Sequence, residues 1–313
     1  MKKYLLPENG AFYKANLHCH TTCSDGRWTP EKVKEEYMAR GYSIVAYTDH
    51  NLMIPHTDLD SEDFLSLTSY EIDFTEPKDG RAFRKTCHLC FIAPTATGTK
   101  QVCYHRTKHV NEKNEHLREL VEFDDTLPDY IREHTPECIN EATRRAREAG
   151  YFVTYNHPTW SNEDFTDYMS YENLDAMEIV NYSCVYSGHE DYNPRVYDDM
   201  LRSYKQRLYC VATDDNHNGN PDSFGGFTVI KAERLDYPSV FAALKAGSFY
   251  ASQAPLIHEL YLDEENKVHI KCSPASRIIL FADRAVSTQR RARPSPKRCS
   301  PSTPMTDTSV SPS

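Results

Sequence analysis

Helical signals alternate with short apolar segments along most of the chain. In the first such stretch Thr29 and Pro30 have the pattern of an N-cap and a first helical residue, and Gly41 marks the helix end. Three stretches share this order, with helices expected at 29–41, 135–150 and 195–206 and with apolar strands expected at 43–47, 151–155 and 208–212. Such alternation predicts βα units around a parallel sheet or barrel.

Polar residues that can bind a metal follow each of these strands directly. The three sequences are Thr48-Asp49-His50, Asn156-His157-Pro158 and Asp214-Asp215-Asn216-His217. Barrel enzymes place their chemistry at the carboxyl ends of the strands. The position of these residues therefore predicts a functional site independently of their type.

The remaining segments predict additions to a barrel that spans residues 1–253. The polar stretch 94–134 is too long for a simple connection, so we expect an insertion that covers the site or forms a disordered lid. Alternating segments at 254–286 predict a small β appendage. The tail 287–313 is rich in Ser, Pro and Arg, which predicts disorder or an aberrant end from an altered reading frame or truncation.

Composition limits the class of protein. A chain of 313 residues can bury one large α/β domain plus a small appendage. The net charge of −10 disfavours nonspecific nucleic-acid binding through a broad basic surface, but it permits a small phosphorylated substrate if bound ions reverse the local field. With no apolar run of membrane-spanning length and no signal peptide, we expect a cytoplasmic protein with no membrane partner and no stable protein partner. The ten cysteines are scattered, which favours buried free thiols over disulfides.

His18 and His20 begin the candidate chemistry. Side chains two residues apart on a strand point to the same side, so both imidazoles can bind one ion. Imidazole ligands suit zinc, iron or manganese. Ser24-Asp25-Gly26 and the polar residues that follow the later strands supply further ligands.

These motifs together resemble the PHP (polymerase and histidinol phosphatase) metal-dependent phosphoesterases of the stand-alone type. The resemblance runs from about residue 18 to 252 and follows the family's motif order: His18-x-His20, Ser24-Asp25-Gly26, Thr48-Asp49-His50, Glu71, His88, Asn156-His157-Pro158 and Asp215-x-His217. It implies an α/β fold, a distorted (β/α)7 TIM-like barrel, which agrees with the βα pattern.

The resemblance also implies a trinuclear metal centre at the carboxyl-terminal mouth of the barrel, holding Mn²⁺, Zn²⁺ or Fe²⁺. The first ion would be held by His18, His20, Glu71 and Asp215, the second by Asp25, His50 and His217, and the third by Glu71, His88 and His157. Asp73 competes with Glu71 for the bridging role.

The implied reaction is hydrolysis of a phosphate ester by attack of a metal-bridged hydroxide at phosphorus, with a nucleotide, an oligonucleotide or a small phosphometabolite as substrate. The resemblance favours the nucleotide or oligonucleotide phosphatases. Candidate substrate-binding residues are Arg27, Asn51 and Asn181, and further candidate cations are Arg84, Lys85 and Arg106. His189 or a metal-bound water is a candidate proton donor for the leaving group.

Two alternatives stay open. Cys87-x-x-Cys90 with His105-x-x-x-His109 resembles a Cys2His2 zinc finger. A PHP-like domain can also be a catalytically silent metal-binding module with a structural or regulatory role. Asp49 and Asp214 adjoin expected ligands, where they would either orient histidines or hydrogen-bond the loops.

Overall fold

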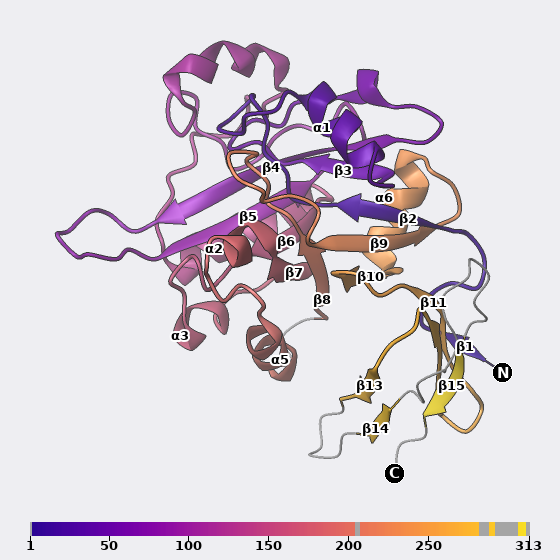
Figure 1. The fold of residues 1–313 in the computed structure, drawn as a ribbon. Coiled ribbons are helices and arrows are strands. Elements are labelled where there is room, and N and C mark those ends of the chain that lie inside the picture. Colours follow the sequence, from indigo (N-terminus) through magenta and orange to yellow (C-terminus); the bar gives the residue numbers. More distant parts are fainter. Residues whose placement is uncertain (1, 204–206, 282–287, 292–305, 311–313) are drawn as a thin grey trace. The chain divides into compact units, whose positions relative to one another are not determined.

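The computed structural model describes residues 2–203, 207–281, 288–291 and 306–310 (Figure 1). The chain divides into two compact units. One comprises residues 11–251. The other comprises the first ten residues together with the chain from Ser252 onward, so the N-terminal strand groups with the C-terminal segment instead of with the barrel.

The larger unit is built on a nine-stranded sheet that curves into a nearly closed barrel (Figure 1). Its order is β10-β9-β2-β3-β4-β5-β6-β7-β8. The strands are β2 (Ala11–Asn16), β3 (Ile44–Tyr47), β4 (Leu65–Thr75), β5 (Thr86–Ile92), β6 (Phe152–Asn156), β7 (Ala176–Asn181), β8 (Tyr209–Thr213), β9 (Phe227–Ala232) and β10 (Phe249–Ser252). The α/β barrel expected from the sequence is confirmed.

The barrel is not wholly parallel. Strands β2–β3–β4 and β6–β7–β8 pair in parallel, but β2–β9, β4–β5 and β5–β6 pair antiparallel. Residues 76–85 join β4 to β5 without a helix, and a connection this short can only reverse the chain into an antiparallel neighbour. The expectation of an all-parallel barrel is therefore wrong at this hairpin.

The helices begin where the capping signals predicted. Thr29 accepts a hydrogen bond from the Lys32 N–H at the start of α1, and Thr135 accepts one from Cys138 at the start of α2. The helices are α1 (Pro30–Met38), η1 (Thr57–Leu59), η2 (Glu112–Leu120), α2 (Pro136–Glu148), α3 (Phe165–Tyr168), α4 (Tyr182–Tyr186), α5 (Pro194–Arg202) and α6 (Tyr237–Ala246). The third helix expected from the sequence is α5, and residues 204–206 of that prediction lie outside the described residues.

Both faces of β3 and β6 are buried, which explains why these strands read as continuous apolar runs. On β3, Ile44 and Ala46 pack in one core cluster, whereas Val45 and Tyr47 pack in another with Tyr37 of α1. This two-sided burial fixes the strand register and so fixes where each strand ends.

The insertion at 94–134 is folded against the barrel and contains η2. Asn114 of η2 donates hydrogen bonds from Nδ2 to the carbonyl oxygens of Thr22 and Ser24 at 3.2 and 3.1 Å. Asn51 Nδ2 donates to the His109 carbonyl at 2.7 Å. The structure therefore shows this segment folded beside the 22–24 loop, and the expectation that it covers the site stays a prediction.

The smaller unit contains the expected β appendage. Strands β1 (Lys3–Tyr4), β11 (Ile257–Leu262), β12 (Val268–Cys272) and β15 (Thr306–Val310) form an antiparallel sheet in the order β1-β11-β12-β15, and β13 (Arg277–Leu280) pairs with β14 (Thr288–Arg291). Of the tail expected to be disordered or aberrant, β14 and β15 are paired strands, and the rest lies outside the described residues.

Two observations concern the chain as far as the structure describes it. None of its helices is long and apolar enough to cross a membrane. The nine cysteines in this part carry free thiols, as the scattered pattern predicted.

Candidate metal centre

The candidate ligands meet at the carboxyl ends of the strands. His18 and His20 lie just beyond the end of β2, and Asp215 and His217 lie just beyond β8. The two segments run side by side, because His20 N–H donates to the Asn216 carbonyl and Asp215 N–H donates to the His18 carbonyl, at 3.1 and 3.0 Å. The histidine pair is therefore held by this bridge instead of by a regular strand.

Three donor atoms form a nearly equilateral triangle. His18 Nε2 lies 3.1 Å from His20 Nε2, and Asp215 Oδ1 lies 3.2 and 3.1 Å from those two nitrogens. Ligands bonded to one ion at about 2.0–2.2 Å lie ~2.8–3.6 Å apart in octahedral or tetrahedral geometry. The triangle therefore has the size that a single divalent ion requires.

Asp215 Oδ1 supplies the test of whether these residues fit an ion. This oxygen is buried and accepts no hydrogen bond of regular geometry, although the imidazole nitrogens of His18 and His20 lie 3.2 and 3.1 Å away. A buried carboxylate oxygen without a partner costs free energy unless a cation satisfies it. The donor set fits a divalent metal at this position.

Glu71 on β4 lies at the centre of the cluster. It is 1% exposed, and its Oε1 lies 3.2, 3.1 and 3.4 Å from nitrogens of His18, His88 and His157. Its Oε2 lies 3.3 Å from His20 Nε2 and 3.2 Å from His50 Nδ1. One carboxylate thus contacts histidines of all three expected ion sites.

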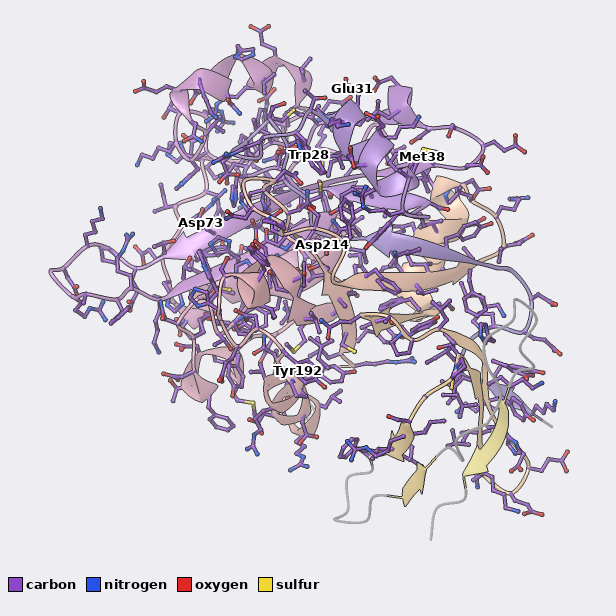
Figure 2. All side chains as sticks on the ribbon, in the orientation of Figure 1. Trp28, Glu31, Met38, Asp73, Tyr192 and Asp214 are labelled. Atoms are coloured by element: carbon purple, nitrogen blue, oxygen red, sulfur yellow. The ribbon has the colours of Figure 1, made fainter. Side chains whose placement is uncertain are left out.

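Asp73, the competitor for that role, is directed elsewhere. Its carboxylate accepts hydrogen bonds from Thr75 Oγ1 at 2.8 Å and from Arg132 Nη1 at 3.4 Å. Figure 2 labels Asp73 near the end of β4. Within the cluster, Glu71 is therefore the carboxylate that β4 supplies.

The second expected set gathers around Asp25. Its oxygens lie 3.7 Å from His50 Nε2 and 3.4 Å from His217 Nε2. Together with His20, these residues form a group whose ligand atoms all lie within 4.8 Å of one another. All nine expected ligands thus fall in one cluster, and their binding of metal stays a prediction.

The charges in this cluster are strongly coupled. Burial alone would raise the pKa of Glu71, but His18 and His88 outweigh it and hold that pKa well below its usual range. Burial would lower the pKa of His20 and His157, yet Asp215 and Glu71 raise these pKa values to about 10 and about 9. His50 differs: burial and the charge of His20 lower its pKa to about 4. Without an ion, protons on imidazoles balance the carboxylates, so metal binding must release protons.

Sequence reasoning missed Glu178 on β7. This carboxylate is 1% exposed and accepts hydrogen bonds from His18 Nδ1 at 2.7 Å and from Thr213 Oγ1 at 2.6 Å. Its second oxygen accepts from His157 N–H and Asn181 Nδ2, both at 3.0 Å. A carboxylate on the far nitrogen of a ligand histidine fixes the tautomer that leaves Nε2 free for a metal. Its only sequence signal was an acidic residue inside an otherwise apolar strand.

The aspartates next to the expected ligands bond the loops. Asp49 accepts from Thr21 N–H at 2.8 Å and from Ser24 Oγ at 2.6 Å. Asp214, labelled in Figure 2, accepts from the N–H groups of Gly225 and Gly226, both at 3.0 Å. Of the two roles left open, the structure shows loop hydrogen bonding.

Two candidate ligands have left-handed backbone conformations. Asp215 has φ of +53° and His157 has φ of +27°. A non-glycine residue in this region costs of order 1–3 kcal/mol and persists only where the surroundings impose it. Gly26 shows a related constraint, since a Cβ there would lie 2.4 Å from the His20 carbonyl oxygen.

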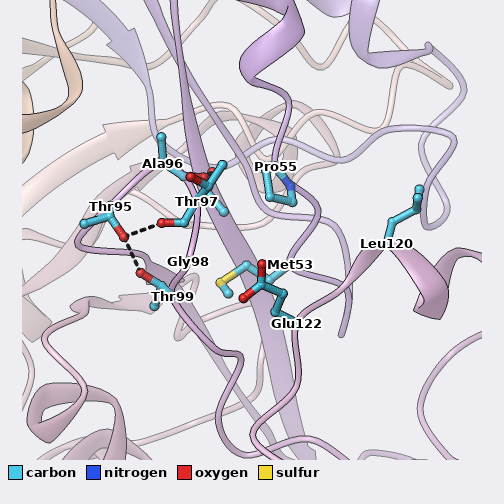
Figure 3. A pocket seen from close by; sticks show the side chains of 10 residues that line it. Met53, Pro55, Thr95, Ala96, Thr97, Gly98, Thr99, Leu120 and Glu122 are labelled. Atoms are coloured by element: carbon cyan, nitrogen blue, oxygen red, sulfur yellow. Dashed lines mark hydrogen bonds between the residues drawn. The ribbon is translucent and has the colours of Figure 1, made fainter.

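A cavity of about 190 Å³ opens above the cluster. Its lining combines expected ligands with residues of α4 and the loop after β6: Asp25, His50, Glu71, His88, His157, Trp160, Ser183, Cys184, Ser187, Asp215 and His217. Among the described residues, no lysine or arginine lines this cavity. A smaller cavity of about 60 Å³, between Met53 and the 95–99 turn, contains none of the expected ligands (Figure 3).

The expected cations therefore lie away from the cavity wall. Lys85 binds Asp164 and Asp167 at 2.8 and 2.6 Å, and Arg106 binds Asp129 at 2.8 Å. Arg27 and Arg84 are exposed, as is the candidate proton donor His189, and none of them lines the cavity.

The two candidate asparagines are buried and do not line the cavity either. Asn181 Nδ2 donates to Asp215 Oδ2 at 3.1 Å as well as to Glu178, so it positions a candidate ligand. Asn51 holds the insertion through the His109 carbonyl.

The four residues of the alternative zinc finger do not assemble. Cys87 packs in the core with Phe74 and Leu89, whereas Cys90 lies beside His18 and accepts a hydrogen bond from Asn156 Nδ2 at 3.0 Å. Residues three apart on a strand face opposite sides, which separates the two thiols. Burial raises the pKa of Cys90 to about 11, so this thiol stays protonated.

An α/β barrel with histidines and carboxylates at the carboxyl ends of its strands has the construction of the metal-dependent hydrolases. The sequence matches no model of a known protein family and none of the curated proteins. Similar solved structures do exist. One is a two-domain protein containing a predicted PHP-like metal-dependent phosphoesterase from Bacteroides vulgatus, with 14% identity, 98% of this chain and 88% of that chain covered, and a TM-score of 0.46.

Two further structures are similar over a smaller share of this chain. One is a candidate metal-dependent phosphoesterase from Bifidobacterium adolescentis, with 17% identity, 70% of this chain and 91% of that chain covered, and a TM-score of 0.41. The other is an amidohydrolase from Chromobacterium violaceum with bound sulfate and no metal, with 14% identity, coverage of 66% and 89%, and a TM-score of 0.41. At such identities and scores these likenesses do not decide the activity of this chain.

Proposed function

We propose that the protein is a metal-dependent phosphoesterase that hydrolyses a phosphate ester of a small molecule. The observation that carries this proposal is the buried triangle of His18, His20 and Asp215, whose aspartate oxygen Oδ1 accepts no hydrogen bond of regular geometry. Buried carboxylates of this kind cost free energy unless protons on the imidazoles or a metal ion offset their charge. The proposed cofactors are three divalent ions, with Mn²⁺, Zn²⁺ and Fe²⁺ as candidates.

Bound divalent ions would lower the pKa of a water molecule and neutralise phosphoryl oxygens as charge moves to the leaving oxygen. The protein's own side chains hold and orient the candidate ligands of these ions. Glu71 contacts histidines of all three donor groups and so links these groups through one carboxylate. Glu178 sets the tautomer of His18, and Asn181 holds Asp215 through its second oxygen. A leaving oxygen can take its proton from water, because the cavity opens to solvent beside exposed Ser187.

Two features favour phosphoester chemistry. The seven motifs occur in the order of the PHP phosphoesterases, and every position that the resemblance assigns to a metal carries a donor that reaches the cluster. The candidate donor groups overlap in one cluster, so divalent ions held by it would lie near one another and could together neutralise charge on one phosphoryl group. A complete donor set also argues against the catalytically silent module.

The test is turnover by the full-length protein after metal removal and reloading with Mn²⁺, Zn²⁺ or Fe²⁺. The panel should contain p-nitrophenyl phosphate, bis-p-nitrophenyl phosphate, AMP, glycerol 3-phosphate and N-acyl amino acids, with metal content measured on the same sample. We expect hydrolysis of phosphate esters that chelation abolishes and metal restores. Hydrolysis of amides alone would replace the proposal with an amidohydrolase. A fully metallated protein that is inert throughout would make it a silent metal-binding module.

A further inference from the structure

The aromatic residue beside the candidate ions bears on which phosphate ester is cut. Trp160 lies on the loop after β6, three residues beyond His157, and lines the cavity above the cluster. Its side chain is 40% exposed, although most large aromatic residues of the barrel unit are buried. An exposed indole inside a polar cavity is an unusual place for apolar surface and indicates a ligand that covers it.

The loop backbone that carries the indole is held in place before any ligand binds. Asp191, which is fully buried, accepts hydrogen bonds from the N–H groups of Thr159 and Trp160 at 3.1 and 2.8 Å. Thr159 Oγ1 also donates to Asn193 Oδ1 at 2.8 Å. The exposure of Trp160 therefore does not come from a loose loop, and little ordering entropy remains to be lost on binding.

The indole is placed directly against the candidate ligands. Its ring meets the imidazoles of His88 and His157 edge to face, with centroids 5.5 and 5.0 Å apart and interplanar angles of 78° and 87°. A group attached to a phosphoryl oxygen at the cluster would extend past this ring. Ser183 and Ser187, which are one helical turn apart, also line this cavity.

Charge limits what that group can be. Within the described part of the chain, the cavity wall carries no lysine or arginine, so it offers no side-chain cation for a second phosphate or a carboxylate of the substrate. The recognition groups that remain are one indole and two hydroxyls. This combination suits a neutral planar ring with polar edges.

We propose that Trp160 is the stacking platform for the leaving group, so that the substrate class is a phosphate monoester or diester whose alcohol carries a nucleobase or aryl ring. The inference rests on the proposed phosphoesterase function and adds its specificity. Stacking of a base on an aromatic side chain changes affinity by about 5- to 150-fold when the aromatic is removed.

The experiment compares the metal-loaded wild type with Trp160→Ala, Trp160→Phe and, as a matched control, Trp28→Phe. Trp28 is the chain's other tryptophan; it packs near Phe224 and does not line the cavity. For AMP and p-nitrophenyl phosphate we expect Trp160→Ala to raise KM about tenfold or more with a smaller change in kcat. Trp160→Phe should restore most of that loss. For glycerol 3-phosphate, which has no ring, all variants should stay within about twofold of the wild type.

The outcomes separate this inference from the proposed function. Equal losses on ring-containing and ring-free esters, or no loss on either, would overturn the stacking platform while leaving the phosphoesterase intact. If no ester is hydrolysed at all, the proposed function fails, and the platform is tested by binding alone. In the Trp28→Phe protein the sole indole is Trp160, so saturable quenching of its fluorescence by AMP but not by glycerol 3-phosphate supports the platform. Absence of quenching by AMP rejects it.

Discussion

Glu178 offers the sharpest test of how the cluster is organised. Its four hydrogen-bond partners, His18 Nδ1, Thr213 Oγ1, His157 N–H and Asn181 Nδ2, all act as donors, two on each oxygen. Glu178→Gln preserves shape and volume but replaces one oxygen with an amide NH₂. If the amide NH₂ faces His157 N–H and Asn181 Nδ2, two buried donors meet a third donor instead of an acceptor; if it faces His18 Nδ1 and Thr213 Oγ1, the hydroxyl can turn to accept, and only the His18 ring loses its acceptor.

The magnitude follows from that geometry. A buried donor left without its acceptor costs about 1–3 kcal/mol, so one or two such donors predict a loss of about 1–6 kcal/mol in the free energy of unfolding. If the amide NH₂ faces His18, the ring also loses the acceptor that sets its tautomer. Removal of such a partner lowers metal affinity about 10- to 100-fold. The expected weakening is therefore about 1.4–2.8 kcal/mol in binding free energy.

The assay is competition with a chromogenic chelator for Zn²⁺ or Mn²⁺, together with calorimetric unfolding of the apo and loaded proteins. Asp175→Asn is the matched control, because Asp175 immediately precedes β7 at the strand's other end and binds Val153 N–H and Lys245 Nζ at 3.0 and 2.9 Å. The control should lose stability with unchanged metal affinity. Wild-type affinity and stoichiometry in Glu178→Gln would refute the reasoning, since His18 would then need no acceptor behind it.

Three further predictions concern the ligands themselves. Asp215→Ala should lose at least one bound ion and reduce turnover by more than about 100-fold while the barrel stays folded, which metal analysis and circular dichroism would check; normal metal content with retained activity would contradict the assignment. The raised pKa values of His20 and His157, about 10 and about 9 against 6.5 when unfolded, stabilise the ion-free protein fully below pH 6.5 and lose that effect as pH rises through 9–10. Metal competes with the same protons, so chelator titrations between pH 6 and 9 should show affinity rising with pH, and a flat profile would count against these two ligands. Gly26→Ala should displace the loop that carries Asp25, because the new Cβ would lie 2.4 Å from a backbone oxygen; we expect a loss of about 1–3 kcal/mol in stability and weakened binding of one ion, and an unchanged metal titration would exclude the loop's role.

The sequence predicted most of the architecture because its signals were local. Thr29 and Thr135 cap helices through contacts within three residues, and the strands that follow are buried on both faces. The direction of β5 was not predictable in the same way. Antiparallel pairing of β4 and β5 depends on residues 76–85 closing a hairpin, and no periodicity within either strand records that reversal.

The residues of the site differ in the same way, because some have local sequence signals and others do not. His18, His20, Asp215 and the other expected ligands lie beside motifs whose spacing carries information, and the structure brings them together. Glu178 contacts His18, 160 positions away, and Trp160 contacts His88, 72 positions away, as well as the nearby His157. The role of each comes from the fold, so an acid in an apolar strand and an aromatic in a loop looked ordinary. Residue type alone could not show that Lys85 and Arg106 bind aspartates away from the cavity, since those pairings also depend on the fold.

The lack of lysine and arginine in the described cavity wall also affects how this net-negative protein would recognise phosphate. Burial excludes water from Glu71, Glu178 and Asp215, and the described cavity wall adds no lysine or arginine to offset them. A phosphate dianion approaching these carboxylates would be repelled unless divalent ions had first reversed the local potential. Phosphate affinity would then depend on metal affinity, because the bound ions would create the positive potential that attracts phosphate. Stacking on the indole of Trp160 would not depend on bound ions, because stacking needs no charge. Selection of the leaving group and attraction of the phosphoryl group are therefore assigned to different parts of the same cavity.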